Sequence, residues 1–244
     1  MNYLISGRSG FIGQSISKYL LNKKETIFEI PRDLSINELI QYFKIYKPDY
    51  IMHLATYGNH YDSQKDFRQM VETNIIGTYN LLEAAKTTDC KLFYNFTATA
   101  ISGDLYYITK YCAEMMVKKY DKVINIRIYS VYGPGEARHK FIPKVIECLN
   151  SGEQMIIDEK ATHAWIFIDD LIKALFKGQT ELGGRVKTAN EDIVWILEKI
   201  SGKKLNYISG KLRSYDNDNW DAPEGICYTD IYEGLKRTYE YYMR

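Results

Sequence analysis

The sequence predicts an α/β fold built on a doubly wound parallel sheet, followed by a small C-terminal lobe. Short β-rich runs alternate with longer amphipathic stretches from residue 2 to residue 128. Closely spaced glycines separate the first of these runs from the stretch that follows it. After residue 134 the alternation becomes irregular. Strands that alternate with helices of this length imply right-handed βαβ crossovers, and therefore parallel strands.

In the N-terminal part, the expected strands are short apolar runs and the expected helices carry apolar residues at helical spacing. In the first helical stretch, for example, Ile12, Ile16 and Leu20 fall on one face. The strands are expected at residues 2–6, 26–30, 49–55, 91–96 and 123–128, and the helices at 11–21, 36–46, 67–86 and 105–119.

The C-terminal part is expected to be mainly helical. Helices are predicted at 140–152, 192–202 and 229–243, and a strand at 164–168. Asp169 and Asp170 are expected to cap and begin a further helix, because carboxylates accept hydrogen bonds from the free amides of a helix start. We therefore expect a first domain of residues 1–133 and a partly interwoven lobe of residues 134–244.

Composition and charge exclude several classes of protein. The chain of 244 residues carries 32 basic and 31 acidic side chains, and no basic run supports binding to nucleic acid. No apolar run approaches the roughly 20 residues of a membrane-spanning helix. The four cysteines are scattered, which favours reduced thiols and a cytoplasmic location. Neither cysteines nor histidines show metal-ligand spacing, so no metal site is expected.

The glycines after the first strand indicate a phosphate-binding turn. Gly7, Gly10 and Gly13 permit a tight turn, close approach of the backbone to a pyrophosphate, and close packing of helix on strand. The helix start that follows would face the phosphates. This arrangement predicts a Rossmann-type domain that binds a dinucleotide through residues of the turn: Gly7, Arg8, Ser9, Gly10, Phe11, Ile12 and Gly13.

The end of the second strand bears on the choice between NAD and NADP. An acidic residue at this point favours NAD, whereas a nearby arginine accommodates the 2′-phosphate of NADP. Glu29 is expected inside the strand, and Arg32, Asp33 and Leu34 just beyond its end. Arg8 is a second cation that could face the same phosphate. The sequence therefore favours NADP(H), with NAD(H) as the alternative.

A tyrosine and a lysine four residues apart lie on one helical face, where both can reach one substrate. That spacing occurs five times in the chain, so spacing alone does not select a pair. Tyr106 and Lys110 open a helix directly after an expected strand, at the sheet edge where ligands bind. The other pairs are Tyr19/Lys23, Tyr61/Lys65, Tyr207/Lys211 and Tyr232/Lys236.

Several motifs occur in the order typical of one family: the glycine turn, "HLAT" at 53–56, "NIIGTYNLLEAA" at 74–85, Tyr106/Lys110, "RIYSVYGPG" at 127–135 and "WIFIDDLIKAL" at 165–175. The chain resembles the extended short-chain dehydrogenase/reductase family of nucleotide-sugar enzymes. Within it, the likeness is strongest to 4-ketoreductases of the CDP-abequose synthase type.

The resemblance implies a role for each matching residue. Tyr106 is similar to the catalytic acid/base, and Lys110 to the residue that binds the nicotinamide ribose and lowers the pKa of the phenol. An ungapped alignment puts Ala98 where the family has a catalytic Ser or Thr, and a one-residue shift puts Thr99 there. Thr99 is therefore the expected catalytic hydroxyl, with Thr97 as a neighbouring candidate. Further cofactor contacts implied by the resemblance are Leu54, Ala55, Thr56 and Asn74.

The chain departs from the family in the region expected to bind substrate. Ser130 stands where many relatives have an Asn, and His163 where many have a phosphate-binding Arg, so a fixed charge and a bidentate donor are absent. The loop between Thr99 and Tyr106 is also shorter than in relatives. The substrate is expected between the strand ends and residues 134–170, with Thr97, Thr99, Ser130, Tyr132, Phe141, Ile142 and His163 as its contacts.

The resemblance also separates the reactions of the family. Dehydratases carry an Asp-Glu pair after the catalytic Thr, whereas Ala100 and Ile101 stand here. An NADPH-dependent reduction of a nucleotide-linked 4-keto-6-deoxy or 3,6-dideoxy hexose is therefore expected. An NAD-dependent 4-epimerase and a non-catalytic dinucleotide-binding protein are the alternatives. A homodimer is expected through the helix of Tyr106 and the helix at 67–86, as in relatives.

Overall fold

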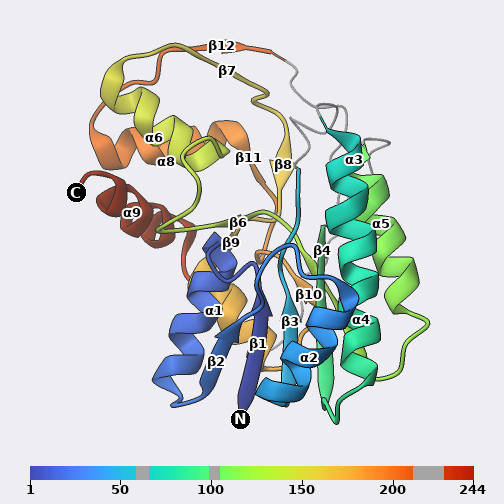
Figure 1. The fold of residues 1–244 in the computed structure, drawn as a ribbon. Coiled ribbons are helices and arrows are strands. Elements are labelled where there is room, and N and C mark those ends of the chain that lie inside the picture. The colour runs from blue at the N-terminus through green and yellow to red at the C-terminus, as the bar shows by residue number, and fades with distance from the viewer. Residues whose placement is uncertain (59–65, 99–104, 211–227) are drawn as a thin grey trace. The chain divides into compact units, whose positions relative to one another are not determined.

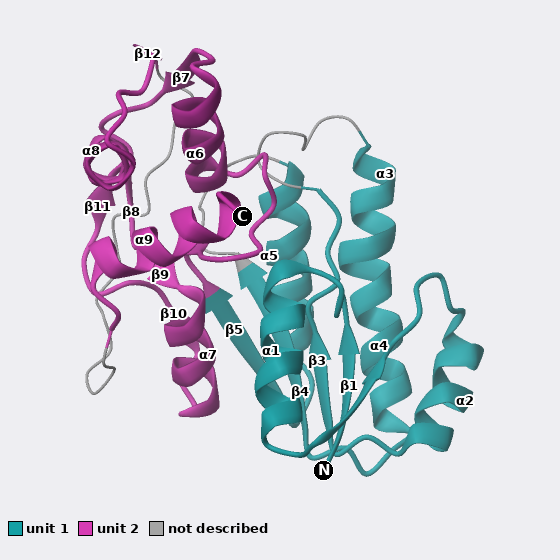
Figure 2. Ribbon diagram, turned by 90° about the vertical axis from the view of Figure 1, so that its left-hand side faces the viewer, with its two compact units in different colours: residues 1–127 teal, residues 128–244 magenta. Residues whose placement is uncertain are grey.

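A computed structural model of the protein describes residues 1–58, 66–98, 105–210 and 228–244. The chain divides into two compact units, residues 1–127 and residues 128–244 (Figure 2).

The first unit is organised by a parallel sheet. Its strands are β1 (Asn2–Ser6), β2 (Thr26–Glu29), β3 (Tyr50–His53), β4 (Leu92–Ala98) and β5 (Val123–Ile128). They lie in the order β5-β4-β3-β1-β2. Strand β1 pairs in parallel with β2 and with β3, and β3 pairs in parallel with β4. The predicted parallel α/β sheet is thus confirmed, and the carboxyl ends of its strands share one edge (Figure 1).

Helices cover both faces of this sheet. Helix α1 (Phe11–Asn22) lies on one side, and α4 (Gly77–Lys86) and α5 (Leu105–Val117) lie on the other (Figure 1). Helix α2 (Ile36–Tyr46) packs against α4, and a capping box between Ser35 and Glu38 fixes its start. A cluster of buried apolar residues lies beneath α2 and α4 and includes Leu4, Phe43, Ile51, Leu81 and Phe93.

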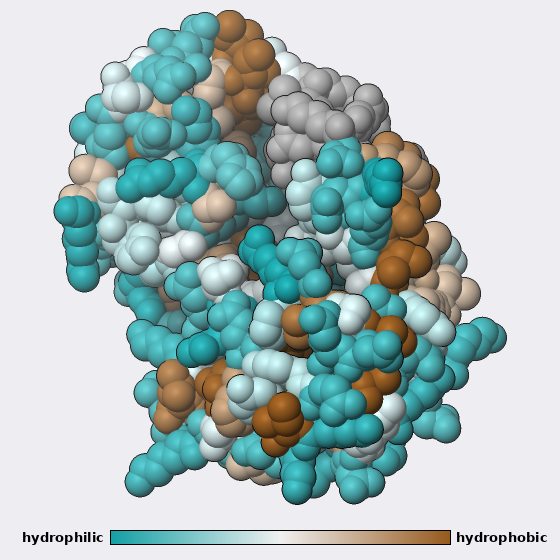
Figure 3. All heavy atoms as spheres, in the orientation of Figure 1, coloured by the Kyte–Doolittle hydropathy of each residue, from teal (hydrophilic) through white to brown (hydrophobic). Residues whose placement is uncertain are grey.

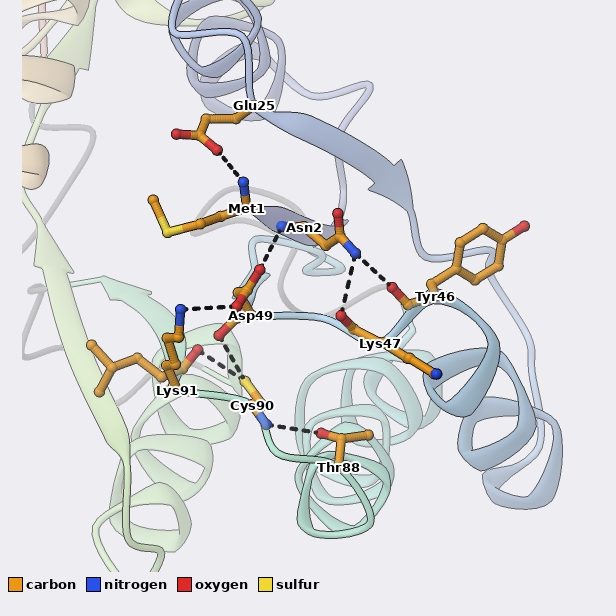
Figure 4. A network of polar contacts seen from close by, with 10 residues as sticks. Met1, Asn2, Glu25, Tyr46, Lys47, Asp49, Thr88, Cys90 and Lys91 are labelled. Atoms are coloured by element: carbon orange, nitrogen blue, oxygen red, sulfur yellow. Dashed lines mark hydrogen bonds and ion pairs between the residues drawn. The ribbon is translucent and has the colours of Figure 1, made fainter.

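The amino ends of the strands are tied together by polar contacts (Figure 4). The Met1 ammonium lies 2.6 Å from a Glu25 carboxylate oxygen. The backbone amide of Asn2 donates to Asp49 at 2.9 Å, and the Lys91 ammonium lies 2.9 Å from the same carboxylate. These contacts lie at the edge of the sheet opposite to the carboxyl ends, so the latter remain available for ligands.

The helix predicted at 67–86 is interrupted in its middle. It consists of α3 (Phe67–Met70), a π-helical segment η1 (Val71–Ile76) and α4. The prediction of one regular helix was therefore wrong for six residues. Such segments are rare and occur frequently at functional sites.

The second unit combines four helices with short strand pairs among its described residues. The helices are α6 (Phe141–Ser151), α7 (Ile168–Phe176), α8 (Asn190–Ser201) and α9 (Ile231–Tyr242). Strand β6 (Val131–Tyr132) pairs with β9 (Ile166–Phe167), β7 (Met155–Ile157) with β12 (Tyr207–Ser209), and β8 (Thr162–His163) with β11 (Thr188–Ala189). A further short strand is β10 (Glu181–Leu182).

The strand predicted at 164–168 is wrong in extent. A turn, in which the Trp165 amide donates to the His163 carbonyl at 3.0 Å, separates β8 from β9, and α7 begins at Ile168. The expected capping by Asp169 and Asp170 is also wrong, because Phe167 is the N-cap residue and no side chain caps it. The two carboxylates bind elsewhere, Asp169 to Arg237 and Asp170 to the amide of Thr229.

Candidate functional site

The glycine turn is shaped by contacts that no larger residue would permit. Gly7 has a φ of +70°, and a Cβ there would lie 2.7 Å from the amide nitrogen of Ala55. A Cβ on Gly13 would strike the carbonyl oxygen of Gly7 and lie 2.8 Å from the Cα of Arg8. The turn therefore requires glycine at both positions, and it brings the start of α1 to the carboxyl end of β1.

The rest of the predicted turn and the end of β3 lie around these glycines. Ser9 and Gly10 are exposed, and Phe11 and Ile12 are half-buried in the first turn of α1. The amide of Leu54 donates to the carbonyl of Ser6 at 3.1 Å. The glycine turn and the start of α1 fit the pyrophosphate of a dinucleotide, because no side chain caps this helix start and the free amides of a helix start bind anions.

Lys110 is a buried cation at the carboxyl end of β4. Its side chain is 5% exposed, and its ammonium donates to the carbonyl of Phe96 at 2.7 Å. Burial lowers the pKa of Lys110 to about 8. Within the described residues this carbonyl is its one hydrogen-bond partner, so two of its three N–H groups are available to a ligand.

Tyr106 lies one turn before Lys110 in α5, and its side chain is half-buried. Its carbonyl accepts a hydrogen bond from the hydroxyl of Thr109 at 2.9 Å. The Thr109 hydroxyl in turn accepts from the Asn74 amide at 3.0 Å. The structure thus links the helix of the predicted catalytic pair to Asn74, a predicted cofactor contact that lies in the π-helical segment.

Asn74 uses all of its hydrogen-bonding capacity. Its carbonyl oxygen accepts from the Thr56 hydroxyl at 3.0 Å and from the Tyr57 amide at 2.8 Å. Its amide donates to the Tyr57 carbonyl at 3.0 Å and to Thr109. Asn74 is 1% exposed, so it holds the chain that follows β3 rather than facing solvent.

His53, the last residue of β3, lies between two hydroxyl groups. Its Nδ1 is 2.7 Å from Ser6 Oγ, and its Nε2 is 2.8 Å from Thr78 Oγ1. Burial, reinforced by the charge of Lys110, lowers the pKa of His53 to about 3, so the ring is neutral at physiological pH.

Of the two candidates for the hydroxyl partner of Tyr106, only Thr97 lies among the described residues. Thr99 lies outside the described residues, as do Ala100 and Ile101. Thr97, in β4, is 4% exposed, and its hydroxyl has no hydrogen-bond partner among the described residues. A buried hydroxyl without a partner is costly, which suggests that a ligand completes its bonding.

The residues expected at the cofactor's adenosine are at least partly accessible to solvent. Arg32 and Asp33 are exposed beyond β2, Asp33 with a φ of 61°, and Leu34 is half-buried. Arg8 instead lines a cavity of about 330 Å³ along α1 to which Arg32 does not contribute. Glu29 lies within β2, as predicted, and is its exposed last residue.

In the second unit, three of the predicted substrate contacts surround Trp165. The rings of Tyr132, Phe141 and His163 lie 6.3, 5.9 and 5.1 Å from the Trp165 ring. The indole N–H of Trp165 is buried and has no hydrogen-bond partner among the described residues. Two further predicted contacts are not part of this aromatic cluster: Ile142 is fully buried in α6, and the Ser130 carbonyl accepts from the Ile166 amide.

The sequence analysis did not predict four residues that lie among these contacts: His53, Thr78, Thr109 and Trp165. His53 and Thr78 lie within motifs that the sequence does show, "HLAT" and "NIIGTYNLLEAA". Their buried hydrogen bonds join different elements, and no local pattern reports such bonds. Across the described residues there is no group of three potential metal ligands, and no helix long and apolar enough to cross a membrane.

Residues 3–181 match the profile of the NAD dependent epimerase/dehydratase family. The chain is 24% identical to dTDP-glucose 4,6-dehydratase of Haemophilus influenzae, over 85% of this chain and 83% of that protein. It is also 24% identical to CDP-abequose synthase of Yersinia pseudotuberculosis, over 99% of this chain and 98% of that protein.

Solved structures show the same fold. UDP-glucuronic acid 4-epimerase from Bacillus cereus, in complex with UDP-glucuronic acid and NAD, superimposes with a TM-score of 0.87. The likeness covers 100% of this chain and 99% of that one at 22% sequence identity. It establishes the Rossmann-like α/β fold for the present chain.

Proposed function

Because the chain belongs to the NAD dependent epimerase/dehydratase family, we propose that it is an NADPH-dependent ketoreductase of a nucleotide-linked 4-keto-6-deoxy or 3,6-dideoxy hexose. The named relatives all act on, or are complexed with, nucleotide-linked sugars. The observation that carries the proposal is the buried Lys110, one turn after Tyr106, whose ammonium binds the Phe96 carbonyl of β4.

The proposed chemistry assigns one task to each of the two side chains. Tyr106 gives a proton to the oxygen of the sugar carbonyl as that oxygen becomes a hydroxyl. The Lys110 charge favours the phenolate and so lowers the pKa of Tyr106 towards the working pH. The two free N–H groups of Lys110 suit the ribose of the cofactor. The nicotinamide, when bound, supplies the hydride for the carbonyl carbon.

The residues after β4 favour reduction over dehydration. Ala100 and Ile101 carry no group able to remove or donate a proton, and elimination of water needs such groups. The match to CDP-abequose synthase spans nearly the whole of both chains, which also supports a reductase. For the hydroxyl that binds the reacting oxygen, Thr97 is supported because it is buried and has no hydrogen-bond partner among the described residues, and Thr99 is the alternative.

A second candidate function is an NAD-dependent 4-epimerase. Glu29 favours it, because an exposed carboxylate at the last residue of β2 suits the free 2′-hydroxyl of NAD. The solved epimerase from Bacillus cereus contains NAD. An epimerase returns its hydride to the sugar, so it would consume no cofactor.

We also propose that the protein is a homodimer. Helices α3, α4 and α5 and the segment η1 expose large apolar side chains, and α5 packs against η1, so these side chains can form one surface. An apolar area is visible over this part of the first unit (Figure 3). The helical apolar surface consists of Phe67, Ile76, Tyr79, Ile108, Tyr111 and Met115.

The experiment incubates the protein with NADPH and a panel of nucleotide-linked 4-keto-6-deoxy sugars. The proposal expects oxidation of one NADPH for each sugar reduced at C4. Inversion at C4 without net oxidation, together with NAD that co-purifies with the protein, would establish the epimerase instead. If every sugar leaves NADPH unchanged and no sugar is inverted, the protein binds dinucleotides without catalysis.

A further inference from the structure

A continuous series of hydrogen bonds runs through the first unit from the glycine turn to the helix of Tyr106. It begins at Ser6, directly before Gly7, and passes through the ring of His53 to Thr78. The Thr78 hydroxyl donates to the backbone carbonyl of Asn74 at 2.7 Å. The side chain of Asn74 then reaches Thr109, whose hydroxyl donates to the Tyr106 carbonyl.

The bonding determines which nitrogen of His53 carries the proton. A threonine hydroxyl has one hydrogen, and Thr78 gives it to the Asn74 carbonyl, which can only accept. Thr78 must therefore accept from His53, so the proton is on Nε2. Nδ1 is then an acceptor, and the Ser6 hydroxyl donates to it. The Ser6 oxygen still accepts from the Ala55 amide at 3.3 Å, which agrees with this direction.

The surroundings of His53 keep the ring in this neutral state. His53 is 2% exposed, and its neighbours from β1 and α4 are the uncharged hydroxyls of Ser6 and Thr78. The ring of Phe93 lies 6.1 Å away on β4. From α5, the positive charge of Lys110 acts on the ring and opposes a second proton. A doubly protonated ring would offer two donors and break the series at Ser6.

We propose that His53 is a positioning residue that, as the neutral Nε2–H tautomer, joins the glycine turn to the first turn of α5. The series fixes both ends of the cofactor site to one another, the phosphate cradle at Gly7 and the backbone of Tyr106. Its catalytic consequence rests on the proposed function, whereas the tautomer and its dependence on Thr78 do not.

The first test observes the ring directly. Nitrogen NMR of protein with labelled histidine should show His53 as the Nε2–H tautomer, unchanged between about pH 5 and about pH 9. The His53→Asn variant identifies its signals. An Nδ1–H tautomer, or titration within this range, would overturn the proposal. This outcome is independent of whether any nucleotide-sugar is turned over.

The second test removes one hydroxyl with a matched control. Thr78→Val deletes the acceptor of the His53 proton, and the tautomer should shift towards Nδ1–H. Thr238→Val is the control, because Thr238 is equally buried and donates to the carbonyl four residues earlier at the same 2.7 Å, but in α9. An unchanged tautomer in Thr78→Val would contradict the series.

The same pair of variants tests the consequence for catalysis. Thr78→Val should lower kcat by about 2- to 30-fold, the range for substitutions along a coupling network, with a smaller change in the KM for cofactor. Thr238→Val should leave both unchanged. Equal effects of the two substitutions would show that Thr78 is merely structural. Absence of turnover in the unsubstituted protein would refute the proposed function but not the tautomer.

Discussion

Lys110 is a buried lysine, and burial disfavours its charged form. The side chain is 5% exposed, and the structure gives its ammonium a carbonyl partner rather than a carboxylate. An uncompensated buried charge costs free energy, and such cost is typical of residues retained for function. The same burial strengthens the field that Lys110 exerts on a phenol one turn away.

This cost predicts how stability depends on pH. Because the pKa of Lys110 falls from its ordinary 10.5 to about 8, the unfolded chain binds more protons than the folded one between these values. The free energy of unfolding should therefore rise by up to about 3 kcal/mol from pH 8 to pH 10.5 through this group. Urea unfolding of Lys110→Met should lack this rise. If both proteins show the same dependence, Lys110 is not the cause.

The residues after β2 predict the cofactor preference. NADPH should bind more tightly than NADH if Arg32 meets the 2′-phosphate, and Arg32→Ala should then weaken NADPH binding by at least about tenfold, with NADH unchanged. Glu29→Gln is the complementary variant, since it should impair only NADH if Glu29 binds a ribose hydroxyl. Fluorescence titration of both cofactors measures these affinities. A preference for NADPH that survives Arg32→Ala would exclude Arg32 from the contact.

Among the elements, the π-helical segment η1 has the most direct connection to the site. It contains Asn74, whose four side-chain hydrogen bonds hold the chain after β3 and the start of α5. These buried bonds stabilise a backbone geometry that is rare in proteins. The segment therefore joins two parts of the site that are distant in sequence.

Asn74→Ala should be strongly destabilising. The substitution removes the four side-chain hydrogen bonds of Asn74, and each such bond contributes about 0.5–1.5 kcal/mol. We expect the free energy of unfolding to fall by at least about 2 kcal/mol, measured by chemical denaturation. Asn80→Ala is the control, because Asn80 is a half-buried asparagine on α4 whose side chain has no hydrogen-bond partner within the part of the chain that the structure describes. A similar loss in both variants would show that η1 does not depend on Asn74.

The sequence predicts elements well where their bounds follow from local chemistry. Helix α2 matches its predicted range, and its start is fixed by a capping box of neighbouring residues, Ser35 and Glu38. Strands β1 and β5 match their predicted ranges as well. The π segment was missed, since its cause is a set of tertiary hydrogen bonds. The strand at 164–168 was overextended, because a turn at Ala164 interrupts an apolar run that reads as one strand.

The same limit applies to the candidate site. The glycine turn was predictable, because a positive φ at Gly7 and the contact at Gly13 demand glycine. The position of Lys110 near the carboxyl end of β4 was also predictable, because its helix directly follows that strand in the sequence. The roles of His53 and Thr78 were not predictable, because their partners lie on other elements. For Arg8 and Arg32, the sequence suggested a shared role that residue type alone could not establish. Both are basic, yet only Arg8 lines the cavity beside α1.

At the scale of the whole molecule, the helical apolar surface predicts self-association. Tyr111 and Tyr79 are both exposed on this surface, and Tyr111→Glu should place a charge within the proposed dimer interface. The variant should elute as a monomer in size exclusion with light scattering, where the unsubstituted protein elutes as a dimer. Tyr241→Glu, an equally exposed tyrosine on α9, is the control and should remain dimeric. A monomeric unsubstituted protein would refute the dimer.

Replacement of Tyr106 by phenylalanine tests the central claim most directly, because it removes the proton donor and keeps the ring. Turnover of the 4-keto-6-deoxy nucleotide-sugar that is reduced best should fall by ~10²–10⁴, the usual scale of general acid catalysis, while NADPH affinity changes little. Tyr107→Phe is the control, because its ring points about 100° away around the helix. Near-full turnover in Tyr106→Phe would contradict the assignment of Tyr106 as the acid and, with it, the proposed mechanism.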